Sequence, residues 1–276
     1  MSTPSDLSLL QPGSPECLQE YSDVVMIALS KLRAISDYHS IAPGVSREMH
    51  KQEAGRHFDA VRGAFGMRVK PFGRNLPDHL NRELVLTEEL ASEWAQIRAE
   101  ERVPLAIGIH DSAVIVFAHS VFEGVVHDLF TFDFRCNPES WESRFAKREV
   151  EFQQATQMDI HALRIAVWQK ERNEIERQRS LQDNVNHLLN RCEVRNAEKY
   201  AALREVYKLN IDIVRKLDKL RQDLVHKTPV PSPISDAKAH LAYILRTTAM
   251  VFHCCGICLF DLPVAGIGME SIFLEA

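Results

Sequence analysis

An arginine and a histidine stand five residues apart near the end of one predicted helix. The segment Leu217–Pro229 reads Leu-Asp-Lys-Leu-Arg-Gln-Asp-Leu-Val-His-Lys-Thr-Pro, with Arg221 and His226 as the pair. A guanidinium can hold a phosphate through charge-assisted hydrogen bonds, and an imidazole that titrates near neutrality can transfer protons. The two side chains together provide the groups needed to cleave a phosphodiester without a metal ion.

The Arg-x4-His spacing is not specific by itself. The chain has 22 Arg and 12 His among 276 residues, so about one such pair is expected by chance. A second pair, Arg74 and His79, lies in a turn-rich segment with Pro77 between its members. Nothing there holds the two side chains in a common geometry. We interpret Arg74 and His79 as loop residues, and the case for Arg221 and His226 rests on their surroundings.

The helix predicted to carry Arg221 has an apolar stripe. Its members follow one another at spacings of three and four, with one polar member, Asn210: Leu203, Val206, Asn210, Ile213, Leu217, Leu220 and Leu224. Arg221 lies about 40° from Leu217 around the helix, at the margin of the stripe, where a permanent charge needs a partner. His226 lies about 140° from Arg221 on a regular helix. The two side chains therefore meet only if the last turn unwinds or if a second chain takes part. Pro229 favours the unwinding, because it disfavours helical geometry at the residue before it.

The surroundings of the pair are locally basic. From Lys199 to Lys227 there are eight Lys and Arg against four Asp and Glu, on a chain with a formal net charge of −5. Such an excess is a modest basic surface of the kind that binds nucleic acid, and Lys219 and Lys227 are the candidate RNA contacts. Basic residues near a helix C-terminus are also ordinary stabilisers. Asp223 either orients a partner or is solvated.

The combination of these residues resembles the HEPN superfamily of small helical domains, many of which are ribonucleases in toxin–antitoxin, abortive-infection and CRISPR systems. The segment from Arg221 to His226, before a Pro-rich turn and a closing helix, matches the Arg-x4–6-His motif of that superfamily. Upstream, Ala118-His-Ser-Val-Phe-Glu123 resembles its Ser-x-x-Glu element through Ser120 and Glu123. The resemblance covers roughly residues 105–262.

The resemblance implies a homodimer in which two motif helices form a composite cleft. RNA would be cleaved there without a metal ion or cofactor, by attack of a 2′-hydroxyl on the adjacent phosphate. Arg221 and His226 would be catalytic, supported by Glu123 and Ser120. The superfamily often has Asn, Asp or His directly after the motif arginine, whereas this chain has Gln222 there and Asp223 one position later.

The composition predicts an all-α fold. Hydrophobic residues make up 45% of the chain and charged residues 26%, with only 11 Gly and 12 Pro, which is typical of a soluble helical bundle. We expect an N-terminal helical region of unknown role over residues 1–103. A HEPN-like domain would follow over 104–276, with a long polar helical excursion at about 140–200.

Local signals predict individual elements. We expect a frayed tail over 1–16, a turn at 42–44 and an irregular segment over 66–86. Thr87 resembles an N-cap, and Ser235 or Asp236 would cap the last helix. The polar segment 169–180 should face solvent or a partner. Helices are predicted over 16–38, 46–65, 88–102, 109–134 and 234–262.

The remaining signals concern compartment and cysteine chemistry. The N-terminus lacks the pattern of a signal peptide, and no uninterrupted apolar run reaches membrane-spanning length, so we expect a cytoplasmic protein. The group His253-Cys-Cys-Gly-Ile-Cys258 contains one Cys-x2-Cys pair and a neighbouring histidine, which makes a zinc site an alternative. These cysteines lie in a mostly apolar run and lack a second ligand pair nearby, so packing in the core is the favoured interpretation.

Three functions follow from these patterns. The main one is a metal-independent HEPN-type endoribonuclease, a toxin or phage-defence effector restrained by an antitoxin or another defence protein. The second is a non-catalytic scaffold or regulatory subunit that dimerises through the same helix. The third is a metal-binding bundle that uses Cys255, Cys258 and a histidine such as His253 or His119. The RNA substrate and the trigger do not follow from the sequence.

Overall fold

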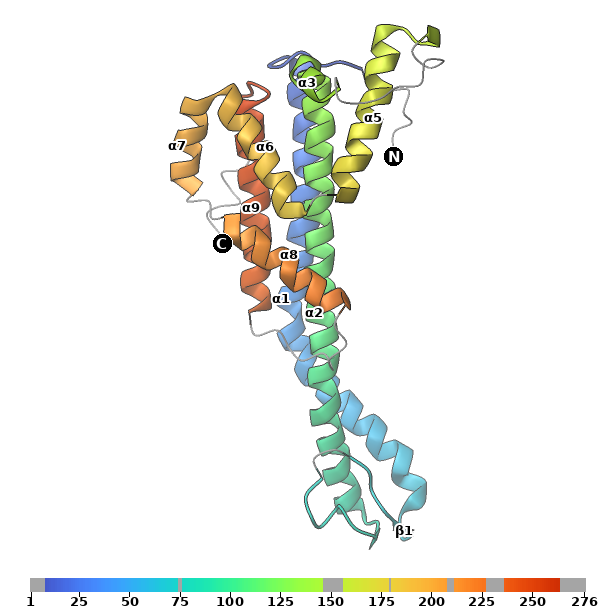
Figure 1. The fold of residues 1–276 in the computed structure, drawn as a ribbon. Helices are drawn as coiled ribbons and strands as arrows, with labels where there is room; N and C mark the ends of the chain where they lie inside the picture. Colours follow the sequence, from blue (N-terminus) through green and yellow to red (C-terminus); the bar gives the residue numbers. More distant parts are fainter. Residues whose placement is uncertain are drawn as a thin grey trace. The chain divides into compact units, whose positions relative to one another are not determined.

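The protein is an all-α helical bundle, as predicted. The computed structural model describes residues 8–73, 76–145, 156–178, 180–207, 211–226 and 236–263 (Figure 1). The elements in chain order are α1 (Pro15–Val61), η2 (Arg62–Ala64), β1 (Arg68–Val69), β2 (Leu84–Val85), α2 (Glu88–Cys136), η3 (Pro138–Trp141), α3 (Glu142–Phe145), α5 (Ile160–Gln178), α6 (Leu181–Arg195), α7 (Ala197–Tyr207), α8 (Ile211–His226) and α9 (Ala237–Cys258).

The chain divides into two compact units that share four helices. The first unit comprises Met1–Ala34, Phe117–Asp223 and His240–Ala276, and the second comprises Ile35–Val116 and Leu224–Ala239. Helices α1, α2, α8 and α9 therefore each contribute residues to both units. The expected domain boundary between residues 103 and 104 lies inside α2.

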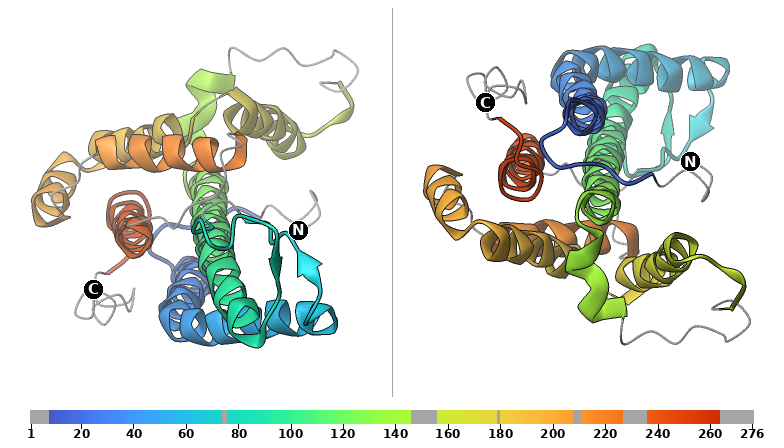
Figure 2. Two further views of the ribbon diagram at one scale, coloured as in Figure 1. Left: turned by 90° about the horizontal axis from the view of Figure 1, so that it is seen from below. Right: turned by 90° about the horizontal axis from the view of Figure 1, so that it is seen from above.

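Aromatic packing joins three helices in the first unit. Figures 1 and 2 show the first part of α1, the last part of α2 and α9 running side by side. The ring of Tyr21 on α1 lies 5.4 Å from that of Phe132 on α2, 6.0 Å from that of Phe252 on α9 and 5.3 Å from that of Phe260. Its hydroxyl donates a hydrogen bond to the carbonyl of Phe252. Tyr21 thereby satisfies its polar atom while its ring fills the core.

The segment before α1 is ordered against this core. The amide of Leu10 donates to the carbonyl of Arg135 at 3.0 Å. Ser14 is the N-cap of α1, because its Oγ accepts from the amide of Cys17 at 3.1 Å, and Pro15 takes the first helical position. The expected frayed tail over 1–16 is therefore wrong from residue 8 onward, since backbone and cap hydrogen bonds hold that part in place.

Two predicted helix interruptions are wrong. Helix α1 continues through 42–44, where a turn was predicted, and α2 continues through Pro104 instead of ending near Arg102. An internal proline costs about 3 kcal/mol. Helix α2 buries Ala99 and Val103 before Pro104, at 2% and 1% exposure, and Val114 and Ile115 after it, at 6% and 1%. Tertiary packing of a long apolar face outweighs the local propensity.

The second unit joins parts of two long helices to a short hairpin. Strands β1 and β2 pair antiparallel, with Arg68 opposite Val85. Leu80 and Trp94 form the centre of a small core, and the Trp94 indole donates to the carbonyl of Phe72 at 3.0 Å. The irregular segment over 66–86 is thus largely confirmed, apart from these two-residue strands.

The predicted cap of α2 is confirmed. Thr87 stands before the first helical residue, and its Oγ1 accepts from the amide of Leu90 at 3.3 Å. Glu88 and Glu89 follow in the first turn, where negative charge interacts favourably with the helix dipole. At the closing helix, Asp236 stands directly before α9, whereas Ser235 lies outside the described residues.

The second half of the first unit differs from its prediction in two places. The polar segment 169–180 contains a buried charge, since Glu171 is 3% exposed and accepts a hydrogen bond from Arg144 at 2.7 Å. The predicted apolar stripe falls on two helices, α7 and α8, and Val206 on α7 is 73% exposed. Leu217 on α8 is the buried member of the stripe, and Leu203, Ile213, Leu220 and Leu224 are partly buried. Asn210 lies outside the described residues.

Among the residues that the structure describes, two helices are long and apolar enough to cross a membrane by length and composition alone. They are α2 and α9. The most apolar stretch of α9 is 78% buried within the protein and that of α2 is 39% buried. The burial of α9 is that of a core helix in a globular fold.

Candidate functional site

Helix α8 carries Arg221 at the edge of its buried face. Val214 and Leu217 are buried at 0% and 2% exposure, whereas Lys216 and Lys219 are exposed. Arg221 is partly buried, at the margin of the stripe as the periodicity predicts. A guanidinium in this position is partly removed from water and needs negative charge nearby.

That negative charge comes first from α2. An Nη2 atom of Arg221 lies 3.8 Å from an Oε2 atom of Glu123, with the two side chains 33% and 36% exposed. This separation is that of an ion pair and is longer than a hydrogen bond. Packing of α8 against α2 therefore brings together the motif arginine and the glutamate of the Ser-x-x-Glu element, which are far apart in the sequence.

A buried histidine adjoins this ion pair. His119 on α2 is 1% exposed, and its Nε2 lies 3.6 Å from an Oδ1 atom of Asp218 on α8. Burial lowers the pKa of His119 to about 4, and the positive charge of Arg221 acts in the same direction. The imidazole is therefore neutral near pH 7. Within the part of the chain that the structure describes, neither ring nitrogen makes a hydrogen bond.

Asp218 is the second carboxylate beside Arg221. Burial raises the pKa of Asp218, and the negative charges of Glu123 and Asp183 raise it further, whereas Arg221 lowers it. The cluster thus contains one guanidinium, two carboxyl groups and a neutral imidazole. Because a third of the Arg221 side chain remains exposed, an anion can reach the guanidinium while the carboxylates hold it in place.

The second motif residue, His226, is exposed at the end of α8. Helical geometry persists through His226, so the unwinding that would bring it round to Arg221 does not occur before this residue. On a regular helix the two side chains point about 140° apart. Arg221 belongs to the first compact unit and His226 to the second.

The supporting residues predicted from the sequence lie in different surroundings. Gln222 and Lys219 are exposed, Asp223 is partly buried, and Lys227 lies outside the described residues. Ser120 is exposed and lines a pocket between α1 and α2, together with Ile27 and Phe117 among others. The structure therefore places Glu123 beside Arg221 but places Ser120 in a different environment.

The second Arg-x4-His match has a different setting. The ring of His79 lies 2.9 Å from a carboxylate oxygen of Glu93, and both side chains are nearly half exposed. Arg74 lies outside the described residues. An exposed ion pair at the base of α2 is consistent with the interpretation of this segment as a loop.

The cysteines pack in the core. Cys254, Cys255 and Cys258 are at most 3% exposed, and the Sγ of Cys255 lies 3.9 Å from that of Cys192. Burial raises the pKa of Cys254 to about 12, so this thiol stays protonated. Among the described residues, no group of three or more His, Cys, Asp or Glu is arranged to hold a metal ion.

Sequence reasoning missed two members of the cluster. Asp218 was not singled out, and His119 was considered only as a possible metal ligand. A signal for both was present, because Asp218 precedes Arg221 by three residues and His119 precedes Glu123 by four. Residues at these spacings lie on the same face of a helix. No family model, curated protein or solved structure matches this chain, so its function is argued from the site itself.

Proposed function

We propose that the protein is a metal-independent endoribonuclease of HEPN type. The observation that carries the proposal is the 3.8 Å ion pair between Glu123 and Arg221. Two sequence elements that resemble the same superfamily meet there in one charged cluster. Arg221 contacts the scissile phosphate and stabilises the charge that develops on it, and no cofactor takes part.

The reaction needs a proton acceptor and a proton donor. A base removes the proton of a 2′-hydroxyl, the freed oxygen attacks the adjacent phosphorus, and the bond to the 5′-oxygen breaks. An acid then protonates the departing 5′-oxygen, which leaves a 2′,3′-cyclic phosphate and a 5′-hydroxyl. His226 can fill either role. Since a regular α8 directs His226 about 140° away from Arg221, the proposal includes a homodimer in which two motif helices supply the groups.

The charged cluster prepares Arg221 for this role. The ion pair with Glu123 limits the directions in which the guanidinium can point, and Asp218 adds a second carboxyl group that interacts electrostatically with Arg221. His119 contributes no charge near pH 7, because its pKa is lowered to about 4. Preorganised charge aimed at the phosphate lowers the barrier without a reorganisation cost during the reaction. Lys219 and Lys227 would add contacts to the RNA backbone.

The biological setting follows from the resemblance alone. The proposal is a cytoplasmic toxin or phage-defence effector that an antitoxin or another defence protein restrains. Expression in a bacterial host should then slow growth, and His226→Ala should relieve the toxicity. Equal toxicity of the two forms would contradict this setting.

Cleavage of labelled RNA in the presence of EDTA tests the enzymatic proposal. We expect fragments with 2′,3′-cyclic phosphate ends, and Arg221→Ala and His226→Ala should each lower the cleavage rate at least about a hundredfold without changing the mass of the dimer. Arg215→Ala is the matched control, because Arg215 is an exposed arginine on the same helix that interacts with Gln182. Full activity of both motif variants would show that the proposed site is wrong.

The second candidate is a non-catalytic scaffold that dimerises through α8. The ion pair of Arg221 with Glu123 and its electrostatic interaction with Asp218 favour it, because a neutralised arginine can serve packing alone. In that case purified protein would leave RNA intact, and Arg221→Ala would shift the dimer toward monomer. Cleavage in EDTA with an unchanged dimer mass for Arg221→Ala would exclude the scaffold.

A further inference from the structure

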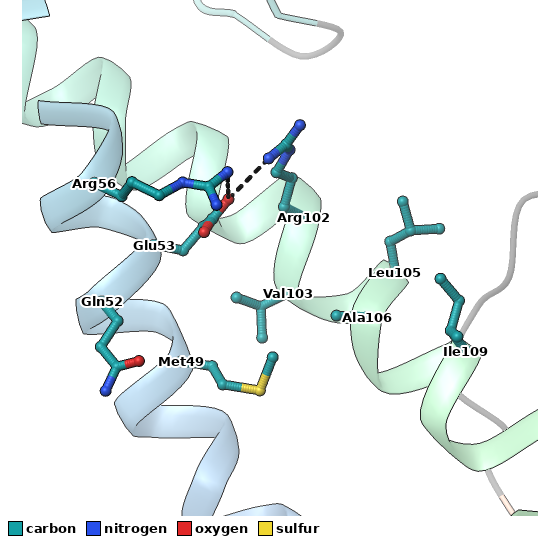
Figure 3. Close-up of a pocket in the computed structure, with 9 residues that line it drawn as sticks. All are labelled: Met49, Gln52, Glu53, Arg56, Arg102, Val103, Leu105, Ala106 and Ile109. Atoms are coloured by element: carbon teal, nitrogen blue, oxygen red, sulfur yellow. Dashed lines mark hydrogen bonds and ion pairs between the residues drawn. The ribbon is translucent and has the colours of Figure 1, made fainter. Parts of the chain in front are cut away.

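A pocket of about 350 Å³ lies between α1 and α2 in the second unit. Its volume is in the range that small-molecule sites occupy. Figure 3 shows that one end is charged and that the rest is lined mainly by apolar side chains. This pocket contains none of the residues assigned to the RNA site, so an inference about it stands or falls separately from the proposed function.

The charged end has more positive than negative groups. Glu53 accepts a hydrogen bond from Arg56 at 3.2 Å and one from Arg102 at 3.1 Å. The ring of His57 lies 3.3 Å from the same carboxylate, and burial lowers the pKa of His57, which disfavours its charged form. Two guanidiniums around one carboxylate leave one positive charge in excess. Arg56 and Arg102 are 65% and 49% exposed, so a solute can reach both.

The apolar part extends from this end along α2. Val103 is 1% exposed and forms part of the floor, Met49 contributes from α1, and Ile109 is 54% exposed at the far end. From Arg102 to Ile109 the helix rises by about 10 Å. An exposed isoleucine beside a concave apolar surface is incompletely covered and would gain from contact with an aliphatic group.

We propose that this pocket binds a small amphiphile with an anionic head group and one medium-length aliphatic tail. The head group would accept hydrogen bonds from Arg56 and Arg102, which Glu53 already holds toward each other. The tail would lie over Val103 and Met49 and end near Ile109. A carboxylate and a phosphate monoester are both anions that can accept these hydrogen bonds. An alcohol with a tail of equal length carries no charge.

Titration of the full chain, followed by calorimetry and by NMR, tests the proposal with octanoate, octyl phosphate and octanol. We expect at least one of the two anions to bind at least tenfold more tightly than octanol. The comparison of octanoate with octyl phosphate identifies the preferred head group. Hexanoate should bind about tenfold more weakly than octanoate, because two buried methylene groups are lost.

Variants locate the binding. The double variant Arg56→Gln and Arg102→Gln should weaken binding of the preferred anion at least tenfold and leave octanol binding unchanged. Arg62 is an exposed arginine in η2, directly after α1, and does not line the pocket, so Arg62→Gln should bind like the wild type. Circular dichroism checks that each variant folds. Equal affinity for anion and alcohol, absence of anion binding at millimolar concentration, or an unaffected double variant would each overturn the proposal.

Discussion

The carboxylate of Glu123 on α2 lies 3.8 Å from the guanidinium of Arg221 on α8. This ion pair connects two helices that are separated in the chain by η3, α3, α5, α6 and α7. The direction of Arg221 is therefore set by the packing of α8 on α2, and the local helix sequence alone does not determine it. The consequences of this relationship for activity and stability can be measured separately.

Glu123→Gln should affect activity more than stability. Both side chains of the pair are about one third exposed, so solvent screens the interaction, and its loss should cost less than about 1 kcal/mol of unfolding free energy. If the carboxylate positions Arg221, RNA cleavage should fall roughly tenfold, mainly in kcat. Single-turnover cleavage and urea unfolding measure the two quantities. Glu198→Gln, an exposed acid on α7, is the control. Unchanged cleavage would mean that Glu123 has no positioning role.

Unlike a substitution in the core, His226→Ala should lower the cleavage rate and leave the stability almost unchanged. The side chain is exposed at the end of α8, so the unfolding free energy should change by no more than about 0.5 kcal/mol. Removal of a general acid or base should lower the cleavage rate by roughly 10² to 10⁴-fold. A chemically activated RNA with a good leaving group should recover part of the rate if His226 acts as the acid. An unchanged rate on ordinary RNA would remove His226 from the mechanism.

His119 should make folding stability depend on pH. Its pKa is about 4 in the folded protein, below the ordinary value of 6.5, so the unfolded chain binds the proton more readily. The stabilisation is fully present above pH 6.5 and is lost as the pH falls toward 4. The loss amounts to at most about 3 kcal/mol. Urea unfolding of the wild type and His119→Gln at pH 7.5 and pH 5 measures it.

In that comparison, the wild type should lose more stability on acidification than the variant does. His161→Gln provides the control, because His161 is exposed on α5 and should leave the pH dependence of the wild type intact. If wild type and His119→Gln lose the same free energy between the two pH values, the buried imidazole is not the group that titrates.

Periodicity predicted the part of the site that depends on one helix. The spacing of Leu217 and its neighbours placed Arg221 at the margin of a buried face, and the structure agrees. Periodicity could not predict which residues of α2 meet that face, because this depends on how two helices pack. Glu123 was singled out by resemblance to a family motif, and Asp218 was overlooked because a lone carboxylate on a helix is usually solvated.

Local sequence propensity predicted a wrong helix end where tertiary packing continues a long helix. Pro104 was expected to follow a helix end, yet α2 continues from Glu88 to Cys136. The residues around Pro104 gain more from burial than the lost backbone hydrogen bond costs, and this balance is not visible in a short window. The buried Glu171 was missed for a related reason, since its partner Arg144 lies on α3, outside the polar segment.

Asp133 should be the most sensitive polar position of the first unit. It is fully buried and accepts hydrogen bonds from Asn137 and Trp141 at 3.0 Å each and from Nε of Arg191 at 2.6 Å. The guanidinium of Arg191 also lies 4.2 Å from the centre of the Trp141 ring. One carboxylate thus connects α2, η3 and α6.

Asp133→Ala should destabilise the protein by about 3 to 5 kcal/mol, because it leaves the guanidinium of Arg191 largely buried without its counter-ion. Trp141→Phe removes one donor to the carboxylate and should cost about 1.5 to 3 kcal/mol. Glu142→Ala is the control: Glu142 pairs with Arg164 at 2.8 Å while more than half exposed, so its loss should cost less than about 1 kcal/mol. Urea unfolding of the three variants measures these free energies. Equal small effects at Asp133 and Glu142 would mean that solvent reaches Arg191 and solvates its charge.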